Sequence, residues 1–345
     1  MRVITLKHPP SVIGYAAVVG GKEHEGPLGA DFDLHDPTGT FGMDTWEKSE
    51  SEMQRLALNL ALAKGKCADS VPQVIFAGDL MNQCTGSAYG LLGFQKPYFG
   101  LYGACSTFAE ATVLSSMLIS AGYFENAAAI SSSHFCSAER QFRFPLEYGG
   151  QRAPTAQWTA TASGAVILGA SGNGPYITEV LPGMIVDKGI NDINNMGAAM
   201  APAAIDTLTA YFTETGRKPE DFDLILTGDL GLEGHGITLS LMKNNGYDMT
   251  SVYNDCGLLL YGRDSQDVHC GGSGCGCSAS VICGHILKRF AKGELQNVLY
   301  LATGALMSPG RIKQGATIPG IAHLVHISAQ RIGEEERNGL DRGIA

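Results

Sequence analysis

The sequence has no long apolar run and no block of basic residues, and each absence excludes a class of protein. No stretch approaches the roughly 18 to 20 consecutive apolar residues of a membrane-spanning helix, and the apolar start at residues 11–21 is typical of a strand. No five Lys or Arg residues follow one another, and the net charge is −10. We therefore expect no direct binding to nucleic acid or to an anionic membrane.

The cysteines do not follow the pattern of a disulfide framework or of a metal site. Their number, nine, is odd, and their spacing is not that of a small secreted domain. The cysteine-rich stretch 269–285 has no CxxC pair, and its last cysteine falls in an expected helix, so we expect no metal ion. The GGSGCG run lacks the spacing of a dinucleotide-binding loop. We expect free thiols, no cofactor and a cytoplasmic protein.

The residues that are present indicate a layered α/β protein. Apolar residues make up 44% of the 345-residue chain and charged residues 17%, which suits two halves with well-buried cores. The 45 glycines, with many Ala and Ser, favour close packing of helices and strands and tight turns where backbone meets a ligand.

The chain repeats itself. The run VIFAGDL at 74–80 returns as LILTGDL at 224–230, and the stretch from Ala104 returns from Gly276. In both copies of the second stretch a Cys-Ser turn opens an amphipathic helix, which a glycine ends at Gly122 and Gly293. We expect two halves, residues 1–170 and 171–345, related by a pseudo-twofold axis.

Each half is expected to run helix, strand, turn, helix, strand. Asp44, with Glu47 three residues on, resembles an N-terminal cap before a helix over 46–64, and the counterpart helix is expected over about 198–215. Crossover connections of this kind build sheets that are mixed but mostly parallel and are covered by helices.

Several motifs resemble a known superfamily. The segment PYFGLYGACSTFAEA around Cys105 resembles the nucleophile turn of thiolases and ketoacyl synthases, and TASGAVILG at 161–169 resembles the strand that follows it. Three longer runs resemble the stage V sporulation protein AD family in particular. They are SVIGYAAVVGGKEHEGPLGADFD, TFGMDTWEKSESEM and ERQFRFPLEYGGQRAPTAQWTATASGA.

This resemblance implies a thiolase-like duplicated αβαβα layered fold and a homodimer that serves spore formation. It implies a protein that binds dipicolinic acid (pyridine-2,6-dicarboxylate), possibly as the calcium chelate, during uptake into the forespore. It also implies membrane proteins of the same sporulation operon as partners, and hence a place peripheral to the forespore inner membrane.

Cys105 is the position that matches the superfamily nucleophile. A helix N-terminus favours a thiolate there, although a buried Cys among Ala and Ser can also be a packing residue. Condensing enzymes also need His with Asn or a second His. Here Gly228 and Asp229 occupy the first of these places, and Gly274 or Cys275 the second. We expect the condensation chemistry to be lost.

Other candidates for the site come from loops and from the resemblance. His235 and His269 lie in glycine-rich loops and could approach the thiol, and the resemblance implies that Cys275 and Cys277 line its pocket. The remaining ligand-binding candidates are Arg140, Arg143 and Arg152, which could pair with carboxylates, and the turn residues Asp79 and Asp229, which could hold polar donors or meet calcium.

Three hypotheses remain open from the sequence. The first is a non-catalytic protein that binds dipicolinate. The second is an active acyltransferase that uses Cys105 with an unusual base. The third is a scaffold for membrane partners whose pocket is vestigial.

Overall fold

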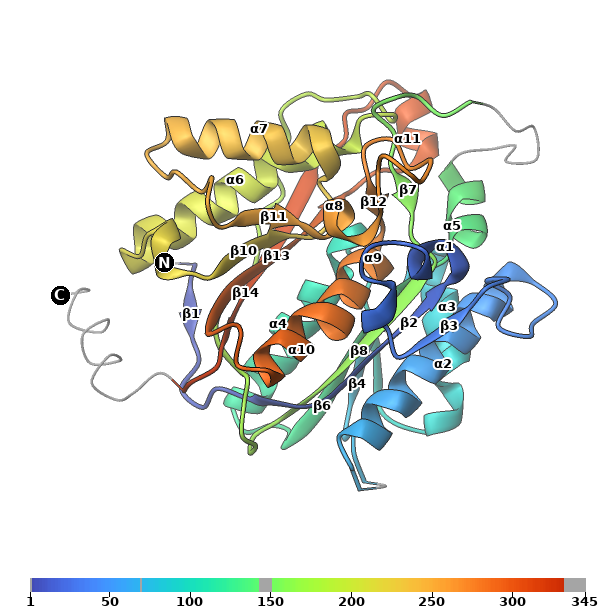
Figure 1. Ribbon diagram of the computed structural model, residues 1–345, viewed down its shortest axis with the longest axis vertical. Helices are drawn as coiled ribbons and strands as arrows, with labels where there is room; N and C mark the ends of the chain where they lie inside the picture. The colour runs from blue at the N-terminus through green and yellow to red at the C-terminus, as the bar shows by residue number, and fades with distance from the viewer. Residues whose placement is uncertain (1, 69, 143–150, 332–345) are drawn as a thin grey trace.

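Two five-strand units with the same strand order form the centre of the computed structural model, which describes residues 2–68, 70–142 and 151–331 (Figure 1). The order is β2-β8-β6-β4-β5 in the first unit and β9-β14-β13-β10-β11 in the second. The first unit comprises β2 (Ser11–Gly20), β4 (Ile75–Gly78), β5 (Tyr98–Gly100), β6 (Asn126–Ser133) and β8 (Ala162–Gly169). The second comprises β9 (Tyr176–Leu181), β10 (Leu224–Thr227), β11 (Tyr253–Asp255), β13 (Asn297–Ala305) and β14 (Gly320–Ser328).

The pairing directions repeat as well. In each unit, taken in the order given, the first two pairings are antiparallel and the last two are parallel. The duplicated α/β fold is therefore confirmed, and the two units are mixed but mostly parallel, because among their five strands only β8 and β14 run against the others. The units join where Ser11 pairs with Tyr176. The boundary expected between residues 170 and 171 falls in the link from β8 to β9 and stays a prediction.

Matched pairs of helices cover the outer faces. The first unit carries α2 (Trp46–Lys64) and α3 (Thr85–Leu91), and the second carries α6 (Met196–Thr215) and α7 (Gly231–Asn244). The helix expected over 46–64 is confirmed, but its N-cap is Thr45, whose hydroxyl accepts from the Lys48 amide at 3.3 Å, and not Asp44.

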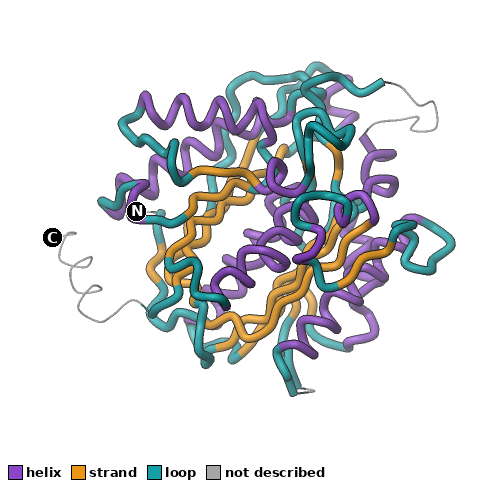
Figure 2. Tube along the Cα trace, viewed as in Figure 1, coloured by secondary structure: helices purple, strands orange, loops and turns teal. Residues whose placement is uncertain are grey.

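A third pair of helices lies between the two units (Figure 2). One is α4 (Thr107–Ser120), and the other runs from α9 (Cys275–Val281) through a π-helical turn at Ile282–Ile286 into α10 (Leu287–Ala291). Helix α4 packs on β6 of the first unit and on β14 of the second. Helix α9, from the second half of the chain, packs on β8 and β6 of the first unit. Gly164 permits this approach, because a Cβ there would lie 2.3 Å from the Ala279 carbonyl oxygen.

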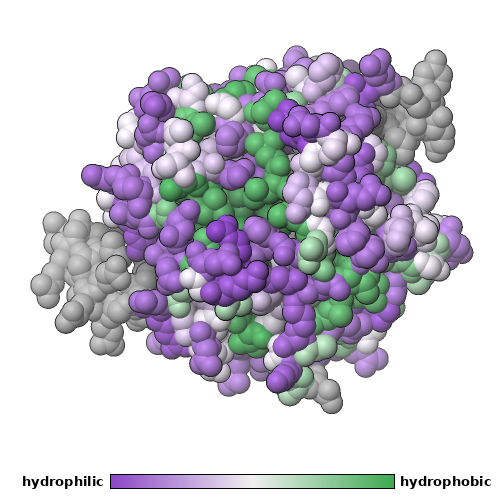
Figure 3. All heavy atoms as spheres, viewed as in Figure 1, coloured by the Kyte–Doolittle hydropathy of each residue, from purple (hydrophilic) through white to green (hydrophobic). Residues whose placement is uncertain are grey.

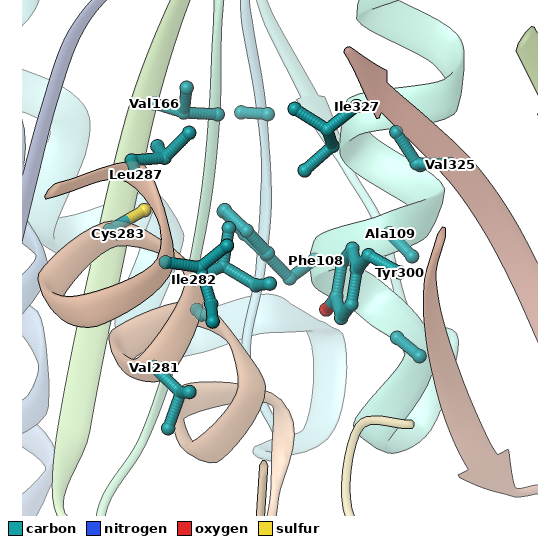
Figure 4. Close-up of a cluster of buried hydrophobic side chains, with 14 of the residues drawn as sticks. Phe108, Ala109, Val166, Val281, Ile282, Cys283, Leu287, Tyr300, Val325 and Ile327 are labelled. Carbon is teal, nitrogen blue, oxygen red and sulfur yellow. The ribbon is translucent and has the colours of Figure 1, made fainter. Parts of the chain in front are cut away.

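The core between these layers is apolar and closely packed. Figure 4 shows Phe108 of α4, Ile282 of the central helix and Tyr300 of β13 meeting in one cluster. The rings of Phe108 and Tyr300 lie 6.2 Å apart at a tilt of 53°. Gly122 and Gly293, expected to end the two central helices, both have positive φ, 80° and 74°, which glycine adopts without steric cost.

The surface is largely hydrophilic on the face shown in Figure 3, with apolar residues gathered in its middle. Within the described ranges, no helix is both long and apolar enough to cross a membrane.

Candidate functional site

A pocket of about 450 Å³ opens beside the start of α4. Segments from both units form it: the turn after β4, helix α5 (Phe135–Phe142), the short strands β7 (Trp158–Thr159) and β12 (Gly272–Ser273), the start of α6 and the segment after β13. Its lining consists of Leu80, Asn82, Tyr102, Ala104, Cys105, Glu139, Gln141, Phe142, Ala156, Gln157, Thr159, Ile193, Asn194, Met196, Ser273, Ala305, Leu306, Met307, Ser308 and Pro309.

Cys105 lies in this lining, as the sequence predicts, but it is not a thiolate. Its side chain is 8% exposed, and its Sγ lies 3.9 Å from the hydroxyl oxygen of Ser273. Burial and the negative charge of Asp229 raise the pKa of the Cys105 thiol well above its ordinary range. Burial and the charge of Asp229 therefore outweigh the helix N-terminus, which favours a thiolate, in setting the pKa of Cys105.

Asp229, which the resemblance aligns with a histidine of the superfamily, interacts with the Cys105 thiol. Its carboxylate accepts from Ser273 Oγ at 3.0 Å, from the Gly274 amide at 2.9 Å and from Thr303 Oγ1 at 3.0 Å. Burial raises the pKa of Asp229 to about 6. The residue is 1% exposed and does not line the pocket, so it supports the floor and holds Ser273 in position.

Cys275 and Cys277 do not line the pocket, which corrects the expectation. Both are fully buried in the first turn of α9. Cys275 donates to the Ser132 carbonyl at 2.9 Å, and Cys277 points to the Gly228 carbonyl at 3.9 Å. The turn packs so closely that a Cβ on Gly276 would lie 2.1 Å from the Ala162 carbonyl oxygen, which leaves no room for a ligand.

Asp79 is likewise buried away from the lining. It has no exposed surface, and it accepts from the Met81 amide at 2.9 Å and from the amide and hydroxyl of Ser87 at 2.8 and 2.6 Å. It therefore fixes the turn that follows β4, and Leu80 and Asn82 of that turn do line the pocket.

The histidines proposed as substitutes for a catalytic base lie elsewhere. The ring of His235 stacks on Tyr253 with centroids 4.4 Å apart, and burial lowers the pKa of His235. His269 hydrogen bonds to the Ala153 carbonyl at 2.7 Å, and His134 to the Gly39 carbonyl at 2.9 Å. None of these rings belongs to the pocket lining.

The described arginines are not in the pocket either. Arg140 of α5 forms an ion pair with Glu47 of α2. Arg152 pairs with Asp267 at 2.9 Å and lies over the ring of Trp158. Arg143 follows Phe142 in the sequence and lies outside the described residues. The lining residues named above include Glu139 but no Lys or Arg.

Sequence reasoning missed the polar residues of the lining, among them Ser273, Gln157, Thr159 and Glu139. Ser273 stands where Gly274 or Cys275 was expected. Gln157 donates both amide hydrogens inward, to the carbonyls of Asp229 at 2.7 Å and Gly272 at 2.8 Å. Thr159 donates to Glu139 at 2.8 Å. The strands β7 and β12 that carry Thr159 and Ser273 are two residues long, and no periodicity is visible in so short a segment.

The site as a whole offers a thiol whose pKa is raised and side chains that can both donate and accept, among them Asn82 and Asn194. A condensing site needs donors that stabilise an oxyanion and a base that activates the thiol. Asp229 would instead oppose thiolate formation by its charge. In the described ranges, no group of three or more His, Cys, Asp and Glu side chains is arranged to hold a metal ion.

Comparisons with known proteins give relatives over nearly the whole chain. The model of the family "Stage V sporulation protein AD" matches residues 1–328. Stage V sporulation protein AD of Bacillus subtilis (strain 168) is 42% identical over 317 residues, which cover 92% of this chain and 94% of that protein.

Solved structures of thiolase-like enzymes share the fold at low identity. OleA of Xanthomonas campestris superposes with a TM-score of 0.58 at 13% identity, covering 93% of this chain and all of that one. The 3-oxoacyl-[acyl-carrier-protein] synthase III of Aquifex aeolicus VF5 gives 0.55 at 13%, with 92% and 99% covered. Human mitochondrial 3-ketoacyl-CoA thiolase gives 0.56 at 11%, with 94% and 99% covered. These structures establish the thiolase-like fold.

Proposed function

The chain belongs to the stage V sporulation protein AD family, and we propose that within spore formation its pocket binds dipicolinic acid without catalysing a reaction. The observation that carries the proposal is the pairing of an open pocket with a disabled nucleophile. The pocket of about 450 Å³ opens beside Cys105, while burial and the charge of Asp229 raise the pKa of the thiol. This combination favours ligand binding without catalysis.

The lining suits a flat ring that carries polar groups at its edge. Phe142, Tyr102 and the small residues Ala104 and Ala156 offer apolar surface, and the polar residues converge from the β7–β12 side. The described lining also carries the carboxyl group of Glu139 and the amide oxygens of Asn82 and Asn194. We therefore propose that the ligand enters with calcium, a cation that prefers such oxygen ligands.

Two further parts of the proposal rest on family membership. The protein acts in uptake of its ligand into the forespore, and it does so at the inner forespore membrane beside membrane proteins of the same operon. Its own chain supplies the binding step.

The rival function is acyl transfer through Cys105, and a direct assay separates the two. We expect purified protein offered a panel of acyl-coenzyme A and acyl-carrier thioesters to release no product above the buffer rate, because the thiol is protonated at neutral pH. The Cys105→Ala variant is the control and should give the same rate. Turnover by the parent that disappears in this variant would establish the enzyme and end the binding-only account.

We also propose a homodimer through the edge strand β5. Its residues Tyr98 and Phe99 are 37% and 52% exposed, and the neighbouring Tyr89 and Leu92 are both 72% exposed. β5 is the last strand of its unit, so its free edge can pair with another strand. Aromatic side chains on an unpaired edge fit a second copy of the same surface.

Substituting Phe99 with Asp should convert this dimer into a monomer. Light scattering of the parent is expected to give twice the 36.4 kDa chain mass, and the variant close to the single mass at micromolar concentration. A charge buried at the interface without a partner costs several kcal/mol. Leu241→Asp, at an exposed position of α7 in the other unit, should leave the dimer intact. Parent protein that runs as a monomer contradicts the proposal.

A further inference from the structure

A buried carboxyl network lies behind the pocket and contributes no residue to its lining. Glu50 of α2 has no exposed surface. It accepts from Ser132 of β6 at 2.9 Å and from Ser137 of α5 at 2.6 Å. The network is separate from the turn around Cys105, and it links α2 to β6 and α5.

The network fastens two segments that form one wall of the pocket. Through Ser137, Glu50 holds α5, whose residues Glu139, Gln141 and Phe142 line the cavity. The second segment is the turn after β4. Gln54, one turn further along α2, links Ser132 at 2.7 Å to Ser87 at 2.8 Å, and Ser87 donates to Asp79, which fixes that turn.

The two segments are also joined to each other at the cavity. The Asn82 amide donates to Gln141 Oε1 at 3.3 Å, and Gln141 donates back to the Ser137 carbonyl at 3.4 Å. A shift of α5 relative to α2 would therefore move both the helix and the turn that bound the ligand.

Two contacts tie α5 to α2, and they differ in strength. The Arg140–Glu47 ion pair is on the surface, where side-chain exposures are 41% and 36% and solvent weakens the pair. The Glu50–Ser137 hydrogen bond is buried, where leaving either partner unsatisfied is costly. The buried contact is therefore the stronger of these two links between α5 and α2.

The protonation state of Glu50 fits this role. Burial, together with the charge of Asp79, raises the pKa of Glu50 to about 8, so it is neutral at pH 7. Its carboxyl oxygens can then accept from Ser132 and Ser137 without a buried charge, and the Ser137 hydroxyl has a second acceptor in the His134 carbonyl at 3.2 Å. The titratable groups coupled to Glu50 by charge are Asp79, at the end of β4, and Cys275, at the start of α9.

We propose that Glu50 is a positioning residue of the pocket: through its hydrogen bond with Ser137 it holds α5 in the arrangement that binds ligand. Only the ligand-binding measurement that tests this inference rests on the proposed function. The direction in which ligand affinity depends on pH follows from the raised pKa of Glu50. The neutral form persists below about pH 8, and above it Glu50 ionises beside Asp79, which favours entry of water between α2 and α5. Ligand affinity should then fall.

The test compares four variants with the parent by titration calorimetry of sodium dipicolinate with calcium from pH 6 to 9. We expect Glu50→Ala and Ser137→Ala to weaken affinity about tenfold at pH 7, the effect of one lost buried hydrogen bond. Glu50→Gln, which keeps the shape and a donor, should stay within about threefold of the parent. Arg140→Gln is the matched control, because it breaks only the exposed α5–α2 contact, and should leave affinity unchanged.

The pH profile separates positioning from general support of the fold. The parent should lose affinity about tenfold between pH 7 and 9, as the neutral fraction falls, and Glu50→Gln should not. Any change near pH 6, where Asp229 titrates, should be the same in both proteins. A Glu50→Gln profile identical to that of the parent overturns the proposal, as does parental affinity in Glu50→Ala.

A second readout needs no ligand. Hydrogen exchange of residues 135–142, corrected for the intrinsic pH dependence, should quicken in Glu50→Ala and, above pH 8, in the parent but not in Glu50→Gln. If no protein binds dipicolinate while α5 behaves in this way, the proposed function fails and the role of Glu50 in placing α5 stands. If dipicolinate binds but exchange of α5 is the same in all variants, the positioning role fails alone.

Discussion

Replacing Cys105 with Trp should reduce dipicolinate affinity about a hundredfold or more, whereas Cys105→Ser should keep it within about threefold. Cys105 is 8% exposed, and its one open side faces the cavity next to Ser273. An indole at this position must enter the space above the pocket floor, because the other sides are filled by buried backbone and α4. Serine nearly keeps the volume and the weak polarity of the thiol.

The same pair of variants tells packing apart from reactivity. A mechanism that needs a sulfur nucleophile predicts that Ser and Trp fail alike, since neither can replace a thiolate. A binding site predicts that only the bulky residue fails. Circular dichroism should show that both variants remain folded, and a folded Cys105→Trp protein with parental affinity would place the ligand somewhere else.

Asp229→Leu should lower the free energy of unfolding by about 4 kcal/mol, measured by urea titration. The substitution leaves three buried donors without an acceptor: Ser273 Oγ, the Gly274 amide and Thr303 Oγ1. Each buried donor that loses its partner costs about 1–3 kcal/mol. The floor of the pocket should be lost with them, so we expect ligand binding to disappear as well.

Asp229→Asn separates the effect of losing the charge from the effect of losing the hydrogen-bond acceptor. Its side-chain oxygen can still accept, and removing a charge that burial disfavours offsets part of the loss, so the variant should lie within about 1 kcal/mol of the parent. Asp187→Leu serves as a control for the loss of an exposed acid that accepts from Thr317 and Gly189, and should change stability much less. Equal destabilisation by the Leu and Asn variants would show that charge, and not the three donors, makes Asp229 matter.

Sequence reasoning placed Cys105 and Asp229 because their positions are set locally. Cys105 opens a helix after a small-residue turn, and Asp229 ends a repeated strand, so both can be placed from neighbouring residues alone. The pairing of these two positions in space follows from the duplicated order of the strands. For the same reason the expected helix over 46–64 and its counterpart agree with α2 and α6 to within two residues.

The rest of the pocket could not be derived because it depends on tertiary contacts. Thr159 and Ser273 come together where two-residue strands pair, and Glu139 lies there because α5 is held by Glu50. Arg152 was a candidate for its charge, but a nearby carboxylate, Asp267, already pairs with it. Residue type gives the chemistry a side chain can do, while the partner it meets decides whether that chemistry is available to a ligand.

The most direct test of a binding-only pocket beside Cys105 is one calorimetric titration of dipicolinate, with calcium, into the parent protein and into Cys105→Trp. We predict saturable binding at one ligand per chain in the parent and none in the variant. Absence of binding to the folded parent would leave the pocket vestigial and favour a scaffold for membrane partners. Equal binding to both proteins would contradict the assignment of this pocket as the site.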